Sequence, residues 1–216
     1  WVLSGIFGFL LGVLSGIYEG SWLDKGIRIY CHLLISTPTF WMGIVFVMLF
    51  SVKLGWFPVA LSVPIGVIQS EVTFWDKIQH IILPALTLSI LSVANICMHT
   101  REKVCEVMNS DYVLFAKARG ESKGLIAKNH VLRNVSLPAV TLQFLSFSEL
   151  FGGAVFVEQV FSYPGLGQAT VQAGLKGDAP LLMGIVIISL LFVYTGNLLA
   201  DCLYLLIDPR MREGQA

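Results

Sequence analysis

The stretch from Ile78 to Thr100, "IQHIILPALTLSILSVANICMHT", contains no aspartate, glutamate, lysine or arginine. An α-helix needs about 20 such residues to cross the hydrocarbon of a bilayer, so this stretch is long enough to span one. Four similar runs flank it, namely 1–18, 29–52, 134–157 (interrupted only by Glu149) and 179–200. The sequence therefore predicts an all-α, polytopic membrane protein with five transmembrane helices.

The composition predicts the same class of protein. Apolar residues make up 56% of the chain and charged residues 13%, whereas soluble domains usually carry roughly 25% charged residues. The mean hydropathy is +0.77. The formal net charge is zero, which argues against a basic surface that binds nucleic acid. We therefore expect the lipid bilayer, and no nucleic acid, among the partners of this chain.

The distribution of positive charge predicts the orientation. If Trp1 lies outside, the inner segments are residues 18–28, 101–133 and 208–216, and they carry 11 of the 14 lysines and arginines. The other three are Lys53, Lys77 and Lys176. Because loops rich in Lys and Arg stay on the cytoplasmic side, we expect an external N-terminus and a cytoplasmic C-terminus.

The 101–133 segment is too long for a tight connection and too apolar for a solvated tail. Apolar residues recur at helical spacing before Gly120, which interrupts the pattern, and Ser122 can cap a second short helix. We expect a compact protrusion with Lys117, Arg119, Lys123, Lys128, His130 and Arg133 around it. Such an element either rests on anionic headgroups or docks a cytoplasmic partner.

Several motifs in order resemble one known family. "DYVLFAKARG" (111–120) and "HVLRNVSLPAVT" (130–141), with Pro138 eighteen residues after Gly120, resemble the cytoplasmic EAA-type loop of ABC importer permeases of the dipeptide, oligopeptide and nickel group. The resemblance, to the group's B-type subunit, extends through "GSWLDKGIR", "STPTFWMGIVFVMLFSVKLGWFP", "ILPALTLSI", "GGAVFVEQVFSYPGLG", "DAPLLMGIVI" and "DPRMR". The chain departs from the general EAA pattern at Leu114 and Phe115.

The resemblance implies a role for the 101–133 segment as an ATPase-coupling loop. The residues it selects are Ala116, Lys117, Ala118, Arg119, Gly120, Ser122, His130, Arg133, Asn134 and Pro138. Within this set, Ala116, Ala118 and Gly120 would give a slim profile that lets another backbone approach. Pro138 would fix how the loop meets the membrane.

The family also implies partners and a location. We expect a second permease subunit, two cytoplasmic ATPase subunits that hold ATP and Mg, and an extracytoplasmic solute-binding protein, in a bacterial or archaeal cell membrane. The cargo would be peptides or nickel chelates. This chain contains no G-x-x-x-x-G-K-[ST], H-E-x-x-H or G-x-S-x-G motif, so we expect it to be no enzyme and to bind no cofactor.

The start of the chain lies within an apolar run that lacks the basic region and cleavage site of a signal peptide. We therefore expect a fragment that lacks the family's first span and extracytoplasmic region, with residues 1–216 forming one transmembrane permease domain. Gly8, Gly12, Gly16 and Gly20, at intervals of four, predict a face packed closely on another helix. Pro38 predicts a kink in the second span.

Three other features have open interpretations. Glu149, inside a span, either contacts cargo along the translocation path or is a packing residue, and as an ion relay it would make the chain a secondary transporter or channel. Pro164, Gly165 and Gly167 predict an extracytoplasmic turn, with Pro164 and Gly165 at the centre of a type II turn. A non-transporting membrane scaffold is a third possibility. The Cys and His residues lack the spacing of a zinc site, so we expect no metal.

Overall fold

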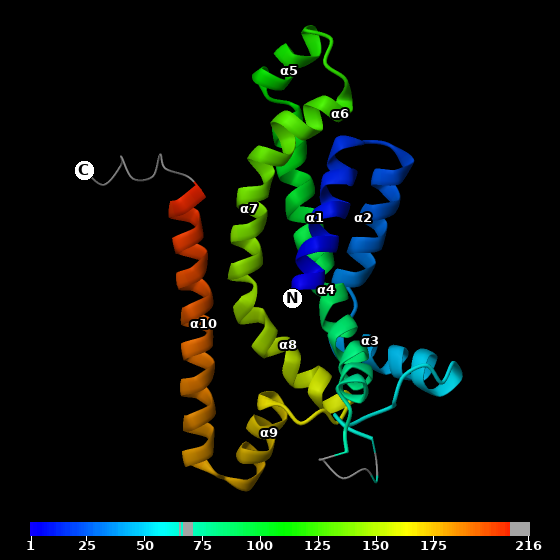
Figure 1. The fold of residues 1–216 in the computed structure, drawn as a ribbon, viewed down its shortest axis with the longest axis vertical. Coiled ribbons are helices and arrows are strands. Elements are labelled where there is room, and N and C mark those ends of the chain that lie inside the picture. Colours follow the sequence, from blue (N-terminus) through cyan, green and yellow to red (C-terminus); the bar gives the residue numbers. More distant parts are fainter. Residues whose placement is uncertain (65, 67–70, 208–216) are drawn as a thin grey trace, which may run out of the picture. The chain divides into compact units, whose positions relative to one another are not determined.

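The computed structural model describes residues 1–64, 66 and 71–207, with the side chains of 133, 147–153 and 203–207 left out of the description. Every regular element in these ranges is a helix (Figure 1). The elements are α1 (Val2–Ile17), α2 (Trp22–Ile35), α3 (Thr39–Phe46), the π-helical η1 (Val47–Lys53), α4 (Phe74–Met108), α5 (Asp111–Ala118), α6 (Lys123–Ile126), the π-helical η2 (Ala127–Val131), α7 (Leu132–Leu145), α8 (Phe147–Val160), α9 (Leu166–Lys176) and α10 (Ala179–Ile207). The predicted all-α fold is confirmed.

The number of spans differs from the prediction. In the described residues, two helices are long and apolar enough to cross a membrane alone, α4 and α10. The pair formed by α2 and α3 with η1 makes a third candidate if it is counted as one broken span. The other two predicted spans are a helix of 16 residues, α1, and a run divided at Ser146 into α7 and α8, of 14 residues each. By helix length and composition, the described residues thus support two or three of the five predicted spans.

Pro38 interrupts the second predicted span more strongly than a kink. Helix α2 ends at Ile35, and α3 begins at Thr39 directly after Pro38, whose φ of −62° and ψ of 137° are extended. Proline has no N–H to donate and disfavours the helical conformation of the residue before it, here Thr37. The run therefore forms two helices.

The chain divides into two compact units. Unit 1 comprises residues 1–36, 91–147 and 195–216, and unit 2 comprises residues 37–90 and 148–194. In unit 1, α1 packs on α4 through its glycines. A Cβ on Gly8, Gly12 or Gly16 would lie 2.8 Å from Ile96, 2.6 Å from the Cys97 carbonyl oxygen or 2.5 Å from Val104, respectively. The predicted close-packing face is thus confirmed for these three. Gly20, which has open space around it and a φ of +77°, belongs to the following turn.

Unit 2 has its own apolar core. Leu83 of α4, Val157 of α8 and Phe161 directly after α8 are buried together. Gly43 of α3 lies against the same part of α8, since a Cβ there would be 3.3 Å from Val160. The amide of Leu61 donates to the carbonyl oxygen of Phe161 at 2.9 Å, which ties the connection after η1 to the end of α8.

Candidate functional site

The 101–133 segment has the predicted elements, but the protrusion begins after Met108 rather than at Arg101. Helix α4 continues to Met108, so the chain leaves α4 eight residues inside the predicted loop. It then forms the short helices α5 and α6 and returns through η2 into α7 (Figure 1). The prediction of two short helices joined at Gly120 is confirmed.

Gly120 ends α5 with a left-handed backbone. Its φ is +83°, its amide donates to the Lys117 carbonyl oxygen at 3.0 Å, and the Glu121 amide donates to the Ala116 carbonyl oxygen at 3.1 Å. These are the two hydrogen bonds of a Schellman motif, which favours glycine because a Cβ is strained at positive φ. A Cβ at Gly120 would meet nothing within 4 Å. The glycine therefore serves the turn of this chain, and close approach within the chain does not require it.

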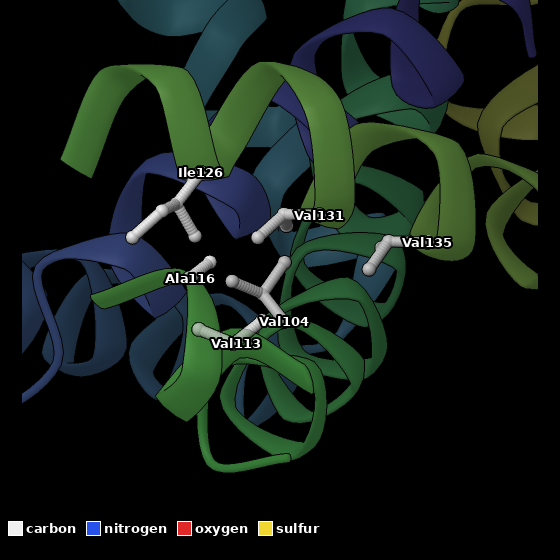
Figure 2. Close-up of a cluster of buried hydrophobic side chains, with 6 residues drawn as sticks. All are labelled: Val104, Val113, Ala116, Ile126, Val131 and Val135. Carbon is white, nitrogen blue, oxygen red and sulfur yellow. The ribbon is translucent and has the colours of Figure 1, made fainter. Parts of the chain in front are cut away.

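The segment encloses a core of its own. Figure 2 shows Val104 of α4, Val113 and Ala116 of α5, Ile126 of α6, Val131 of η2 and Val135 of α7 pointing toward one another. None of the six is more than 3% exposed. At about 25 cal/mol per Å² of buried apolar area, such a cluster stabilises the protrusion as a folded body. The slim-profile interpretation of Ala116 is wrong, since this residue is buried and faces the core of the segment.

Polar side chains also connect the two arms of this segment. The His130 Nε2 lies 3.3 Å from a carboxylate oxygen of Glu121, and Asn134 donates from Nδ2 to the Tyr112 hydroxyl at 3.2 Å and to the His130 carbonyl oxygen at 2.8 Å. Glu121 is also within 3.5 Å of a guanidinium nitrogen of Arg119. These contacts join α5 to η2 and α7, so the two arms of the hairpin are held together by side chains as well as by the core.

Three further predicted residues contribute locally. The Lys117 ammonium donates to the Met108 carbonyl oxygen at 3.2 Å, close to the end of α4. The Ser122 hydroxyl accepts a long hydrogen bond, 3.4 Å, from the Leu125 amide, which confirms Ser122 as the cap of α6. Pro138 lies within α7 and is half-buried. Arg133 belongs to α7, and its side chain lies outside the described residues.

Several large apolar side chains of the segment are exposed. Leu114 and Phe115 are 65% and 67% exposed, and Tyr112 and Leu125 are 45% exposed. Exposed Lys117, Ala118, Arg119, Lys123 and Lys128 accompany them. Large exposed apolar side chains with exposed basic residues on the same segment are typical of a surface that docks a partner. The sequence reasoning missed Leu114 and Phe115 as surface residues. The signal was the spacing of Val113 and Ala116, which places the two bulky neighbours outward.

The predicted outer turn lies in unit 2 and has a different geometry. Gly165 has φ −135° and ψ −176°, so the type II turn centred on Pro164 and Gly165 is wrong. The left-handed residue is Ser162, with a φ of 46°. Its amide donates to the Gln159 carbonyl oxygen at 3.3 Å, and the Tyr163 amide donates to the Glu158 carbonyl oxygen at 2.9 Å. The chain thus reverses at the end of α8, before the exposed Pro164.

Glu158 and Val155 of α8 explain the two glycines of this turn. Its carboxylate accepts a hydrogen bond from the Gln168 amide at 2.8 Å in the first turn of α9, where the helix dipole favours negative charge. A Cβ on Gly165 would collide with this carboxylate. A Cβ on Gly167 would lie 2.6 Å from the Cα of Val155 and 3.1 Å from a Glu158 oxygen. Sequence reasoning missed Glu158, because its partner is ten residues away.

The structure thus brings the 101–133 residues together in unit 1 and leaves the turn in unit 2. Glu149 belongs to α8, and its side chain lies outside the described residues. Among the side chains that are described, no group of three or more His, Cys, Asp or Glu is arranged to hold a metal ion.

Comparisons with known proteins bear on both regions. The family model described as "Binding-protein-dependent transport system inner membrane component" matches residues 8–213. The oligopeptide transport system permease protein AppB of Bacillus subtilis (strain 168) is 36% identical over 210 residues, covering 97% of this chain and 66% of the relative. The di/tripeptide transport system permease protein DppB of Pseudomonas aeruginosa (strain UCBPP-PA14) is 33% identical, covering 98% and 68%.

A third relative is the glutathione transport system permease protein GsiC of Escherichia coli O1:K1 / APEC, which is 35% identical over 212 residues. That match covers 98% of this chain and 65% of the relative. The chain therefore spans about two thirds of the length of the curated relatives that it matches.

Proposed function

This chain belongs to the family of binding-protein-dependent transport system inner membrane components, and we propose that it is a permease subunit of an ATP-binding-cassette importer. In this proposal the chain lines the path across the membrane and alternates between outward and inward openings. It carries no catalytic site of its own, and ATP is hydrolysed on partner subunits.

The observation that carries the proposal is the apolar patch on a stiff protrusion. The Leu114 and Phe115 side chains are more than half exposed, while the body below them is fixed by the Val113 and Ala116 core and the Glu121–His130 contact. A force-receiving element must hold its shape when a partner moves it, and must present surface that a partner can desolvate. The 101–133 segment has both a core that fixes its shape and an exposed apolar surface. An amphipathic helix bound to lipid headgroups would need the exposed apolar surface but no core of its own.

The partners and topology follow from this role. We propose that the 101–133 segment lies in the cytoplasm and docks one of two ATPase subunits, that a second permease subunit completes the path, and that a solute-binding protein delivers cargo outside. The N-terminus would lie outside. Helix α1 and the α7–α8 pair would complete five crossings together with the three candidate spans. The concentration of Lys and Arg in the inner segments supports this orientation.

We propose peptides as the cargo. The three relatives carry names that specify oligopeptide, di/tripeptide and glutathione transport, which supports a peptide over a nickel chelate. The alternative of a secondary transporter that uses Glu149 as an ion relay makes the opposite prediction about energy supply. It requires an ion gradient and no ATPase.

Reconstitution into proteoliposomes tests the proposal. The full-length permease pair is incorporated with and without its two ATPase subunits, and uptake of a labelled tripeptide delivered by the binding protein is measured. We expect uptake only with the ATPases and ATP, and none with a non-hydrolysable analogue. Peptide uptake that persists without ATPase subunits would reject the ABC role, and uptake driven by a proton or sodium gradient would favour the Glu149 relay.

A further inference from the structure

Asp24 is a fully buried carboxylate near the start of α2, and it connects three parts of unit 1. One oxygen accepts hydrogen bonds from the Ser15 hydroxyl of α1 at 2.6 Å and from Arg101 Nε of α4 at 2.7 Å. The other oxygen accepts from the Gly20 amide at 2.9 Å and from Arg101 Nη2 at 2.9 Å. The carboxylate is therefore bonded to α1, to the α1–α2 turn and to α4 at once.

Arg101 presents two parallel donors to this carboxylate. Its side chain is 12% exposed, and one guanidinium nitrogen also lies 3.8 Å from a carboxylate oxygen of Glu19, whose side chain is 49% exposed. Replacing a buried ion pair by apolar residues of similar volume is often neutral or stabilising, so stability alone does not explain the pair. A two-donor fork on a carboxylate does fix the relative orientation of the groups that carry it.

The glycines of α1 make a less directional contact with α4. Gly8, Gly12 and Gly16 of α1 lie close to Ile96, Thr100 and Val104 of α4 and carry no side chains that could donate or accept hydrogen bonds. A glycine face brings two helices close through van der Waals packing, which fixes their relative orientation less strictly than a two-donor ion pair does. The Asp24–Arg101 fork is the directional contact at the end of this face.

The fork also lies at the base of the 101–133 segment. Arg101 is one helical turn before Val104, a member of the segment core. A Cβ on Gly16 would be 2.5 Å from Val104 and 3.1 Å from the Arg101 carbonyl oxygen. Phe9, Val13 and Ile17 of α1 pack against that same core. Displacement of the segment would therefore reach α1 and α2 at this point first.

We propose that Asp24 and Arg101 form a latch that makes the α1–α2 hairpin move with the 101–133 segment, so that the two are positioning residues for coupling ATP hydrolysis to cargo movement. The latch rests on the proposed function. Without the Asp24–Arg101 ion pair, the hairpin is joined to the segment core by the apolar packing of Phe9, Val13 and Ile17, and it follows movement of the segment less closely. The complex then hydrolyses ATP without moving a matching amount of cargo.

The test uses the assembled transporter with its partner permease, ATPases and binding protein. The double variant D24N/R101M removes both charges together, so no uncompensated buried charge remains, and the amide introduced at position 24 keeps an oxygen for Ser15 or Gly20. The matched control is K103M/E106Q, which removes an exposed ion pair of 2.7 Å from the same helix. The readout is the amount of peptide taken up per ATP hydrolysed, measured only on complexes purified with all subunits.

We expect the control to keep the wild-type ratio, and D24N/R101M to hydrolyse ATP while the ratio falls by roughly tenfold, the size of a typical coupling between two sites. A wild-type ratio in assembled D24N/R101M would overturn the latch. If D24N/R101M does not assemble, the R101K variant provides the test. Lysine keeps the positive charge but lacks the two parallel donors of arginine. R101K should lower the ratio severalfold, and an unchanged ratio would overturn the proposal.

Uptake by the wild-type complex distinguishes failure of the latch proposal from failure of the proposed function. Wild-type uptake that depends on ATP, with unchanged ratios in the variants, rejects the latch and leaves the permease role intact. Wild-type uptake that does not depend on ATP rejects both.

Discussion

The two reversals of the chain, at Gly120 in unit 1 and at Ser162 in unit 2, use the same backbone pattern. In each, a left-handed residue follows a helix, and two successive amides bond back to the last turn of that helix. The side chains differ. The first reversal has glycine at the left-handed position and open space around it, whereas the second has serine there and has its glycines three and five residues later. One backbone motif is thus supported by different sequence signals.

The two turns differ in the reason why each requires glycine. Gly120 avoids backbone strain, since a Cβ there would meet no atom. Gly165 and Gly167 avoid collision with the Glu158 carboxylate and the Val155 backbone. The turn at Gly120 is therefore supported by the apolar core of the 101–133 segment. The turn at Ser162 is supported by the Glu158 carboxylate, which accepts a hydrogen bond from the first turn of α9. Substitutions at the two sites should fail for different reasons and by different amounts.

The largest effect is expected for Gly167→Val. The new Cβ would lie 2.6 Å from the Cα of Val155, and backbone atoms cannot move aside as a side chain can. We expect a loss of about 3 kcal/mol, the upper end of overpacking penalties. The measurement is the thermal unfolding midpoint of the purified complex. The control is Gly174→Ala in α9, where a Cβ meets nothing within 4 Å and should not lower the midpoint.

A smaller effect is expected for Ile126→Ala, which leaves a cavity in the core of the 101–133 segment. Ile126 is 1% exposed, and truncation of a buried isoleucine should cost about 2 kcal/mol where the surroundings can relax. Hydrogen exchange of the α5 and α6 amides should accelerate, while that of α9 stays unchanged. Leu125→Ala, at a neighbour that is 45% exposed, serves as the control. Equal protection in both variants would contradict an independent core.

Gly120→Ala should cost about 1 kcal/mol, because an L-residue at a φ of +83° is strained even in open space. ATPase binding to the permease pair should weaken correspondingly in a titration of the two. Gly124→Ala in α6, where a Cβ also has open space, should leave the affinity unchanged. The scaffold hypothesis predicts that even a bulky residue at 120 leaves peptide uptake intact, so reduced uptake would reject it.

The smallest effect is expected for Ser162→Gly, and it is favourable. Relief of left-handed strain, about 1 to 2 kcal/mol, exceeds the about 0.4 to 1 kcal/mol that glycine's unfolded-state entropy costs. We expect the unfolding midpoint to rise slightly. A fall would show that the Ser162 side chain stabilises this turn, and that strain is not what distinguishes it from the Gly120 turn.

What the sequence predicted well was local. Gly120 and Ser122 were identifiable because turns and caps depend on residues three or four positions apart. Charge-free runs identified a membrane protein but not the break at Ser146, which neither glycine nor proline marks. The inward position of Ala116 was indicated only by its spacing from Val113, and its neighbours in the core, Ile126 and Val131, come from other elements.

Long-range contacts could not be predicted. The type II turn was wrong because Gly165 has an extended backbone, and its missing Cβ leaves room for the Glu158 carboxylate, seven residues earlier in the chain. Asp24 and Arg101 are 77 residues apart, and nothing in either local sequence identifies the other as its partner. Only helix packing brings this carboxylate and guanidinium together.

The most direct measurement replaces Phe115 with a photoreactive amino acid in the full-length permease within the assembled complex. We expect illumination to link position 115 to an ATPase subunit. The same group in place of Leu175, an 84% exposed residue of α9, should give no ATPase product. Products at 115 that contain only lipid, or equal ATPase linkage at both positions, would contradict the claim that the 101–133 segment is the surface on which the motor acts.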